Sequence, residues 1–260
     1  MTTFDMACRR EPAASRHVKL MVTCLCDLFF DDAAAATVEV LEHLGCKVEV
    51  PEDQTCCGQP AFNAGDWSAA RRVARHTARV FAGDEPVVVP SGSCARMVSH
   101  GTLVLFEGEA DPREASVAPR AWELCDFIVN GLGVTRWPGR VRARLAWHRS
   151  CHSRGTTYGE AALTLLRSIA DLRLVEFGEP EQCCGFGGTF SVSFPEISRS
   201  VGGLKLDAVM ATSPDGVVSG DMGCLMHLDG LARMRGDRAL PVLHVAQVLR
   251  DALRATKDEG

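Results

Sequence analysis

The stretch VKLMVTC, residues 18–24, opens a strand–helix–strand unit that decides the fold of this chain. Its apolar run is rich in strand-forming residues, and DDAAAATVEVLEHLG (31–45) follows it with a helical pattern. An aspartate at position 31 or 32 is a suitable N-cap, and Gly45 marks the end of the helix. The run KVEV (47–50) is then a second strand. Alternation of this kind predicts a doubly wound parallel sheet.

The same plan continues along the first half and returns in the second half. In the first half, a helix over 65–83 leads to the apolar strand PVVVPSGSC (86–94). The matching segments of the second half are the strand RLAWHRSC (144–151), the helix GEAALTLLRSIADL (159–172), and the strands RLVEF (173–177) and DGVVSGDMGC (215–224).

A single offset of 127 positions relates the two halves, and cysteines mark it. Cys24 and Cys56 lie 32 positions apart, as do Cys151 and Cys183. We therefore predict an α/β fold of two duplicated Rossmann-like modules with parallel sheets, related by a pseudo-twofold axis. The offset pairs Cys24 with Cys151, Cys56 with Cys183, Cys57 with Cys184 and, after a further shift of three residues, Cys94 with Cys224.

The junction between the halves is predicted at the acidic stretch EGEADPREASVAP (107–119), which an amphipathic helix around RAWELCDFIVNGL (120–132) follows. The expected division is an N-terminal tail (1–16), a first Cys-Cys-Gly module (17–106), a linker with a connecting helix (107–142), a second Cys-Cys-Gly module (143–255) and a C-terminal tail (256–260).

The repeated cysteines are the candidate functional residues. All of them follow strands, and ligands of open α/β sheets bind beyond the carboxyl ends of the strands. Four thiolates gathered at one place repel one another unless a metal centre takes up their charge, and soft thiolates favour zinc, copper(I) or an iron–sulfur cluster. Structural zinc sites usually contain Cys-x2-4-Cys motifs, and no Cys-x2-Cys occurs here, so iron–sulfur binding is the preferred interpretation.

Several motifs together carry a family resemblance that covers residues 17 to 252. They are CCGQPAFNAG (56–65), PSGSCARM (90–97), SCHSRG (150–155), CCGFGGTFSV (183–192) and DMGCLMHLDG (221–230). The chain resembles the CCG, or cysteine-rich, domain family of iron–sulfur oxidoreductases, and within it the two-repeat lactate-utilisation proteins. It resembles the cysteine-rich chain of heterodisulfide reductase and the iron–sulfur subunit of glycolate oxidase more distantly.

The resemblance implies an iron–sulfur electron-transfer subunit of a multi-protein system that oxidises L-lactate to pyruvate. The implied partners are a ferredoxin-like iron–sulfur subunit and a third subunit. Such a subunit is an oxidoreductase component that needs its partners for activity. Glycolate or another 2-hydroxy acid is the alternative substrate of the same kind of assembly.

The resemblance also implies a ligand set for clusters of the 4Fe-4S type. In the reductase relatives, the upstream cysteine, both cysteines of the CCG triplet and a terminal Cys-x2-Cys hold a noncubane cluster. Here each half lacks the last cysteine, because Met97 and His227 stand at those positions. Cys26 in the first half, and His152 or His227 in the second, are candidate substitutes. A standard four-ligand cluster, or metal in only one module (zinc included), is equally compatible. The implied ligands are Cys24, Cys56, Cys57, Cys94, Cys151, Cys183, Cys184 and Cys224.

The other cysteines and one histidine have simpler interpretations. Cys46 and Cys125 are expected to be small buried hydrophobic residues, and Cys8 a free thiol in the N-terminal tail. His148 lies on the strand that leads to Cys151 and is expected to be a hydrogen-bonded histidine of the core.

Composition excludes several classes of function. The chain has 260 residues, 46% of them hydrophobic and 23% charged, as in an ordinary globular protein. A net charge of −5 gives no reason to expect nucleic-acid binding. We find no secretory signal and no apolar run of membrane-spanning length, so we expect a cytoplasmic protein without a membrane span.

Two other classes of function compete with the iron–sulfur subunit. A metal-free thiol enzyme would use Cys94, at a strand-to-helix turn where a helix N-terminus lowers the pKa of a thiol. That function does not explain the Cys-Cys-Gly triplets or their duplication. A non-catalytic zinc scaffold with paired sites is the third possibility, and the missing Cys-x2-Cys motifs disfavour it.

Overall fold

Each half of the chain forms a four-stranded parallel sheet with the same strand order. The computed structural model describes residue 13 and residues 15–108, 112–179, 182–237 and 240–257. The order of the first sheet is β2 (Lys47–Glu49), β1 (His17–Leu20), β3 (Val87–Val89) and β4 (Ala121–Glu123). The order of the second is β6 (Ala170–Val175), β5 (Arg140–Trp147), β7 (Gly216–Ser219) and β8 (Val242–His244). The predicted α/β fold of duplicated modules with parallel sheets is therefore confirmed.

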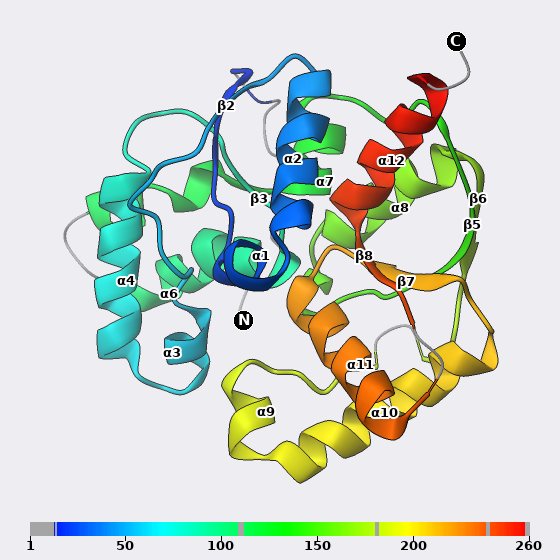
Figure 1. Cartoon of the computed structure of the whole chain (residues 1–260). Coiled ribbons are helices and arrows are strands. Elements are labelled where there is room, and N and C mark those ends of the chain that lie inside the picture. The colour runs from blue at the N-terminus through cyan, green and yellow to red at the C-terminus, as the bar shows by residue number, and fades with distance from the viewer. Residues whose placement is uncertain (1–12, 14, 109–111, 180–181, 238–239, 258–260) are drawn as a thin grey trace.

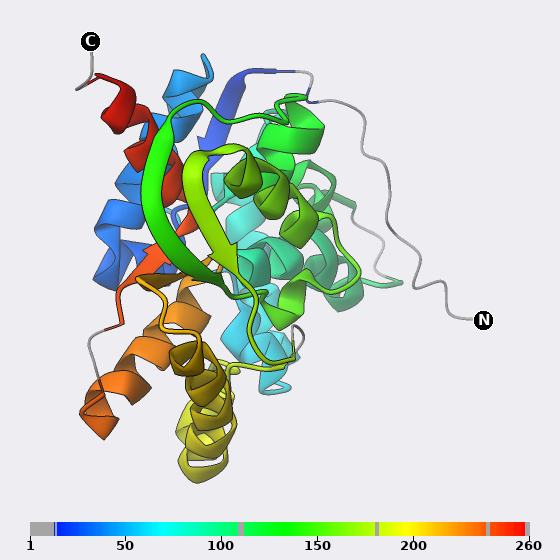
Figure 2. The same cartoon turned by 90° about the vertical axis from the view of Figure 1, so that its right-hand side faces the viewer.

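Helices connect the strands and cover the sheets, and the two halves stand side by side (Figure 1). The α-helices of the first half are α1 (Cys24–Phe29), α2 (Asp31–His43), α3 (Gln59–Asn63), α4 (Trp67–Val80), α5 (Gly92–Arg96), α6 (Thr102–Leu105) and α7 (Leu124–Asp126). Those of the second half are α8 (Tyr158–Ser168), α9 (Thr189–Ser193), α10 (Pro195–Ala211), α11 (Met222–Arg235) and α12 (Val245–Lys257). Figure 2 shows the neighbouring strands β5 and β6 curving together beside α8.

The strands end several residues before the cysteines that were expected to close them. β1 ends at Leu20, and Cys24 is the first residue of α1. Cys94 and Cys224 are likewise the third residues of α5 and α11. In α5 the hydroxyl of Ser91 accepts a hydrogen bond from the Cys94 N–H (3.4 Å) and so caps the helix. These three cysteines therefore lie in the first turns of helices, where the helix dipole favours negative charge.

The segment between the halves supplies a strand as well as a helix. A helix was expected over 120–132, but Ala121–Glu123 forms β4 and pairs with β3. The helix begins only at Leu124, because the Glu123 carboxylate accepts a hydrogen bond from the Asp126 N–H (3.0 Å) and caps it. The fourth strand of the second sheet, β8, has the same place beside β7.

The two halves share one hydrophobic core. One cluster of buried side chains contains Val18 and Leu41 from the first half together with Leu145, Leu165 and Leu249 from the second. In Figure 1, α12 lies directly beside α2. Among the described residues, no helix is long and apolar enough to cross a membrane. The tails predicted at 1–16 and 256–260 fall largely outside the described residues, and Cys8 lies among those that are not described.

An ion pair between the buried Arg250 and the exposed Asp32 also joins α2 and α12. The side chain of Arg250 is 8% exposed, and its Nη2 donates to Asp32 Oδ2 at 3.0 Å. We expect Arg250→Gln to lower the free energy of unfolding by about 1–2 kcal/mol, because hydrogen bonds to a charged partner are lost. Arg254→Gln breaks an exposed pair with Glu39 on the same two helices and should cost less than about 0.5 kcal/mol. Urea unfolding of both variants checks this, and equal losses would contradict it.

Candidate metal centre

One cavity of about 140 Å³ lies between the two halves, and cysteines from both halves line it. Loops and helix N-termini that follow the strands of both sheets meet there, so the two predicted sites open into one space. His152, Gln59 and Asp221 contribute polar groups to the lining. The cysteines of the lining are Cys24, Cys56, Cys57 and Cys94 (the first set) and Cys151, Cys183, Cys184 and Cys224 (the second set).

In the first set the thiols form a hydrogen-bonded chain. Cys24 Sγ donates to Cys56 Sγ at 3.9 Å, and Cys57 interacts with both Cys56 and Cys94. The hydrogen bond from Cys24 lowers the pKa of Cys56, with Cys57 adding to the effect. The same hydrogen bonds raise the pKa of Cys24 and of Cys57, and burial raises both further. The thiolate form is therefore favoured at Cys56, and the thiol form at Cys24 and Cys57.

The second set repeats this pattern. The hydrogen bond with Cys151 lowers the pKa of Cys183 and raises the pKa of Cys151. Cys184 interacts with Cys183 and Cys224, and these contacts raise the pKa of the Cys184 thiol. The N–H of Gly185 donates to Cys183 Sγ at 3.3 Å. Each set thus provides four adjacent sulfur donors that can all ionise only if a metal centre supplies positive charge.

His148 is a residue whose role the sequence did not reveal. It is buried, as expected, with 1% of its surface exposed. Contrary to expectation, neither ring nitrogen has a hydrogen-bond partner among the described residues. A ring nitrogen of His148 and the sulfur atoms of Cys184 and Cys224 all lie within 4.8 Å of one another. Burial lowers the pKa of His148 to about 3, so the imidazole is neutral.

Lys205, on α10, is a second residue that sequence analysis missed. It is 1% exposed, its Nζ donates to the Gln182 carbonyl at 2.6 Å, and it lies 5.3 Å from the centre of the Phe177 ring. Burial lowers its pKa, while the thiolates of the second set, Cys184 foremost, favour the charged form. The adjacent leucines did not signal its burial, because neighbouring residues of a helix lie on different faces and Leu204 is exposed while Leu206 is buried.

The three proposed substitute ligands have different surroundings. Cys26 is fully buried in an apolar cluster that includes Ala33 and Ala146. Nε2 of His227 lies 3.3 Å from the Ser198 hydroxyl. Of the three, only His152 belongs to the described lining of the cavity.

His152 connects the two halves across the cavity. Its Nδ1 lies 3.6 Å from Cys151 Sγ, and its Nε2 lies 2.8 Å from Gln59 Nε2. Both ring nitrogens therefore have partners within the protein. Cys46 and Cys125, which were expected to be hydrophobic core residues, are buried in the core that the two halves share.

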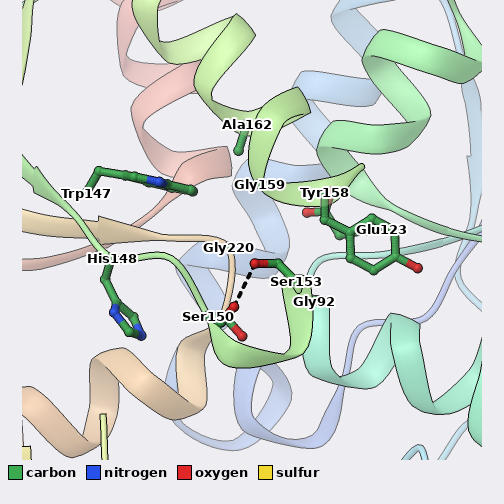
Figure 3. Close-up of a pocket in the computed structure, with 10 residues that line it drawn as sticks. All are labelled: Gly92, Glu123, Trp147, His148, Ser150, Ser153, Tyr158, Gly159, Ala162 and Gly220. Atoms are coloured by element: carbon green, nitrogen blue, oxygen red, sulfur yellow. Dashed lines mark hydrogen bonds between the residues drawn. The ribbon is translucent and has the colours of Figure 1, made fainter. Parts of the chain in front are cut away.

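A small cavity of about 20 Å³ is lined by residues that include His148 and the buried Glu123 (Figure 3). Burial raises the pKa of Glu123 to about 8, and the nearby carboxylates of Asp126 and Asp221 act in the same direction. Asp221 Oδ2 accepts hydrogen bonds from the Ser93 N–H (2.9 Å) and the Ser150 hydroxyl (3.3 Å). Asp221 thereby fixes a loop of each half against the other.

The two Cys-Cys-Gly glycines form a matched pair for substitution. Gly58 (φ +87°) and Gly185 (φ +89°) both have the left-handed conformation, so alanine at either should cost about 1–2 kcal/mol. A Cβ at Gly58 would lie 3.3 Å from Val73 Cγ1 and 3.7 Å from the Ala70 carbonyl oxygen, whereas at Gly185 it would lie 2.4 Å from the Ser198 carbonyl oxygen. We expect Gly185→Ala to destabilise the protein clearly more than Gly58→Ala in urea unfolding. Equal effects would contradict the close contact with α10.

The buried Glu123 predicts a specific dependence of stability on pH. The folded-state pKa of Glu123, about 8, lies above the ordinary value of 4.5. The contribution of this carboxyl group to the free energy of unfolding is therefore fully present below pH 4.5 and is lost as the pH rises through 8. Glu123→Gln should remove this loss and be more stable than the wild type by a few kcal/mol at about pH 9, but not at about pH 4. Urea unfolding at both pH values tests this, with Glu176→Gln as an exposed control. A constant difference between wild type and Glu123→Gln would refute it.

Comparison with known proteins agrees with this architecture. The model of the CCG family, described as a cysteine-rich domain, matches residues 18–99 and again residues 145–229. Two relatives are 40% identical: "Lactate utilization protein A 2" of Bacillus cereus over 239 residues (91% of this chain, 98% of the relative), and "Lactate utilization protein A" of Geobacillus sp. over 235 residues (89% and 98%).

A solved structure supports the fold alone. A hypothetical protein from Helicobacter pylori superposes with a TM-score of 0.67 at 11% identity. The match covers 94% of the present chain and 50% of the Helicobacter pylori protein. The two matches to the family model together cover more than half of the present chain. This chain therefore belongs to the CCG, or cysteine-rich, domain family.

Proposed function

We propose that this chain holds iron–sulfur clusters in its two cysteine sets and transfers electrons within a multi-protein system that oxidises L-lactate to pyruvate. The observation that carries the proposal is the single cavity lined by eight cysteines from two duplicated halves. The names of the relatives, which are lactate utilisation proteins, supply the substrate. The partners in the proposal are a ferredoxin-like iron–sulfur subunit and a third subunit.

The donor atoms suit a cluster better than a single zinc ion. Zn–S bonds of about 2.3 Å place the sulfur atoms of a tetrahedral site about 3.8 Å apart. Cys24 and Cys56 meet this distance, but no three donor atoms of the first set lie within 4.8 Å of one another among the described residues. A multi-iron cluster spreads its thiolate ligands more widely. We therefore propose clusters of the 4Fe-4S type in both sets. Zinc in the second set is the alternative, because His148, Cys184 and Cys224 have donor atoms within 4.8 Å of one another.

The residues of the chain have distinct roles in this proposal. The eight cysteines hold the clusters, which accept and pass electrons one at a time when bound. The buried cation of Lys205 stabilises added negative charge at the second set. Oxidation of lactate to pyruvate releases two electrons and two protons, so two centres facing one cavity suit the stepwise removal of an electron pair. In this proposal the partner subunits bind the lactate carboxylate.

Two alternatives remain as competing proposals. Glycolate or another 2-hydroxy acid would use the same centres, since its oxidation also releases two electrons. A metal-free thiol enzyme would use Cys94, but Cys94 lies among three other thiols whose arrangement the second set repeats. A single nucleophile requires neither the group nor its duplication.

Anaerobic reconstitution with iron and sulfide tests the proposal. We expect the wild type to become brown and to bind iron and acid-labile sulfide. Cys24→Ser and Cys151→Ser should each remove roughly half of the iron, because each removes one ligand of a different set. Cys46→Ala is the matched control, since Cys46 is buried in the core away from the cavity, and it should keep its full iron content.

Other outcomes would replace the proposal with one of its competitors. Protein that binds zinc but no sulfide would support the zinc scaffold, and iron-free protein with activity lost in Cys94→Ser would support the thiol enzyme. Reduction of the chain in the presence of its partners by L-lactate, but not by glycolate, would establish the substrate. Reduction by glycolate alone would assign the system to that acid.

A further inference from the structure

We propose that His148 is a direct ligand of the metal centre in the second cysteine set, and that the two centres of this chain therefore differ in chemistry. This inference rests on the proposed function in one respect, namely that the second set holds metal. It adds a ligand that lies outside the four repeated cysteines.

The position of His148 is fixed by the second sheet. Its N–H donates to the Val218 carbonyl at 2.9 Å, which continues the pairing of β5 with β7 beyond Trp147. In Figure 3 the side chains of Trp147 and His148 point to opposite sides of the chain, and that of His148 points toward α11. The strand register therefore directs the imidazole to the helix that carries Cys224.

The imidazole is placed as a ligand would be. A ring nitrogen lies within 4.8 Å of the sulfur atoms of both Cys184 and Cys224, and these three residues are all buried. Both ring nitrogens lack hydrogen-bond partners among the described residues, which costs free energy for so deeply buried a polar group. Coordination would use the lone pair of one nitrogen and leave the ring proton on the other. Neutral imidazole is the form that binds metals.

The other polar groups around this site are less suited to coordination. His227 faces the hydroxyl of Ser198, and Lys205 is held by the Gln182 carbonyl and has no lone pair when charged. The carboxylate of Asp221 is engaged by Ser93 and Ser150. His148 therefore differs from its neighbours in having both a free donor atom and the required proximity to two cysteines.

The first half has a different residue at the equivalent position. The offset of 127 positions places Met21 opposite His148. Met21 is 1% exposed and packs in an apolar cluster with Cys57 and Val87. The first set therefore has thiolates only, whereas the second combines thiolates with a neutral imidazole. A neutral imidazole brings no negative charge to the centre, whereas a thiolate at its place would lower the reduction potential, and the positive charge of Lys205 raises the potential of the second centre further. Electrons should consequently settle on the second centre.

Pulsed electron paramagnetic resonance on the full-length protein tests the assignment. A Cys24→Ser, Cys56→Ser background leaves the second centre as the source of the signal after anaerobic reconstitution and reduction. We expect strong coupling to a histidine nitrogen, identified by incorporating histidine labelled with a heavy nitrogen isotope. His148→Met, which copies the first half, and His148→Cys should both lose the coupling. His148→Cys should also lower the midpoint potential, and the control His227→Gln should keep both properties.

Each outcome supports or overturns a specific step. The labelled parent protein keeps His148, so its spectrum does not depend on whether a His148 variant folds. Absence of histidine coupling in its reconstituted cluster overturns the inference but not the proposed function. Coupling that persists in His148→Met overturns it as well. Failure to bind any iron or sulfide contradicts the proposed function instead. If the second set binds only zinc, cobalt(II) takes the place of zinc in the test. Loss of a nitrogen ligand in His148→Cys should then change the visible spectrum of the bound cobalt. A spectrum identical to that of the wild type overturns the inference.

Discussion

The structure depends on the electrostatics of eight thiols held at one cavity. Within each set the sulfur atoms are close enough to hydrogen-bond, so ionisation of Cys56 or Cys183 opposes ionisation of the neighbouring thiols. A fold gains no stability from gathering such groups, because their burial raises the pKa of most of them and leaves little to offset it. The arrangement is explained if a bound metal centre neutralises the negative charge. The surrounding loops, the helix N-termini and the buried Lys205 then all stabilise the same charged centres.

The shared core makes this arrangement possible. The two sheets have the same strand order, so each would present its cysteines at its own carboxyl edge even if the halves were separate. It is the packing of α2 against α12, together with the buried cluster that includes Leu145 and Leu249, that turns the two edges toward one cavity. Asp221 adds a polar connection by accepting hydrogen bonds from both halves. Duplication without this packing would give two isolated centres.

Sequence alone could predict the fold and the cysteine sets, because both are periodic features. The offset of 127 positions and the strand–helix alternation locate the parallel sheets and place each repeated cysteine after a strand. It could not predict that both sets line one cavity, because this depends on packing between residues far apart in the chain. It also misjudged His148, since strand register and the lack of a partner for the imidazole appear only in three dimensions. The strand β4 was missed because its three residues pair with β3 and immediately precede a helix.

The two halves differ at buried positions that are equivalent in the two sheets. Met21 and His148 occupy equivalent positions, and the last residues of β4 and β8 are Glu123 and His244. Burial raises the pKa of Glu123 to about 8 and lowers that of His244 to about 4, so an acid and a base are both held neutral near pH 7. Neither side chain therefore adds a charge to the interior at that pH. Lys205 lies beside the second set, so the two copies of the motif have different electrostatic environments. The positive charge favours an added electron at the second centre, which gives electron transfer between the two centres a direction.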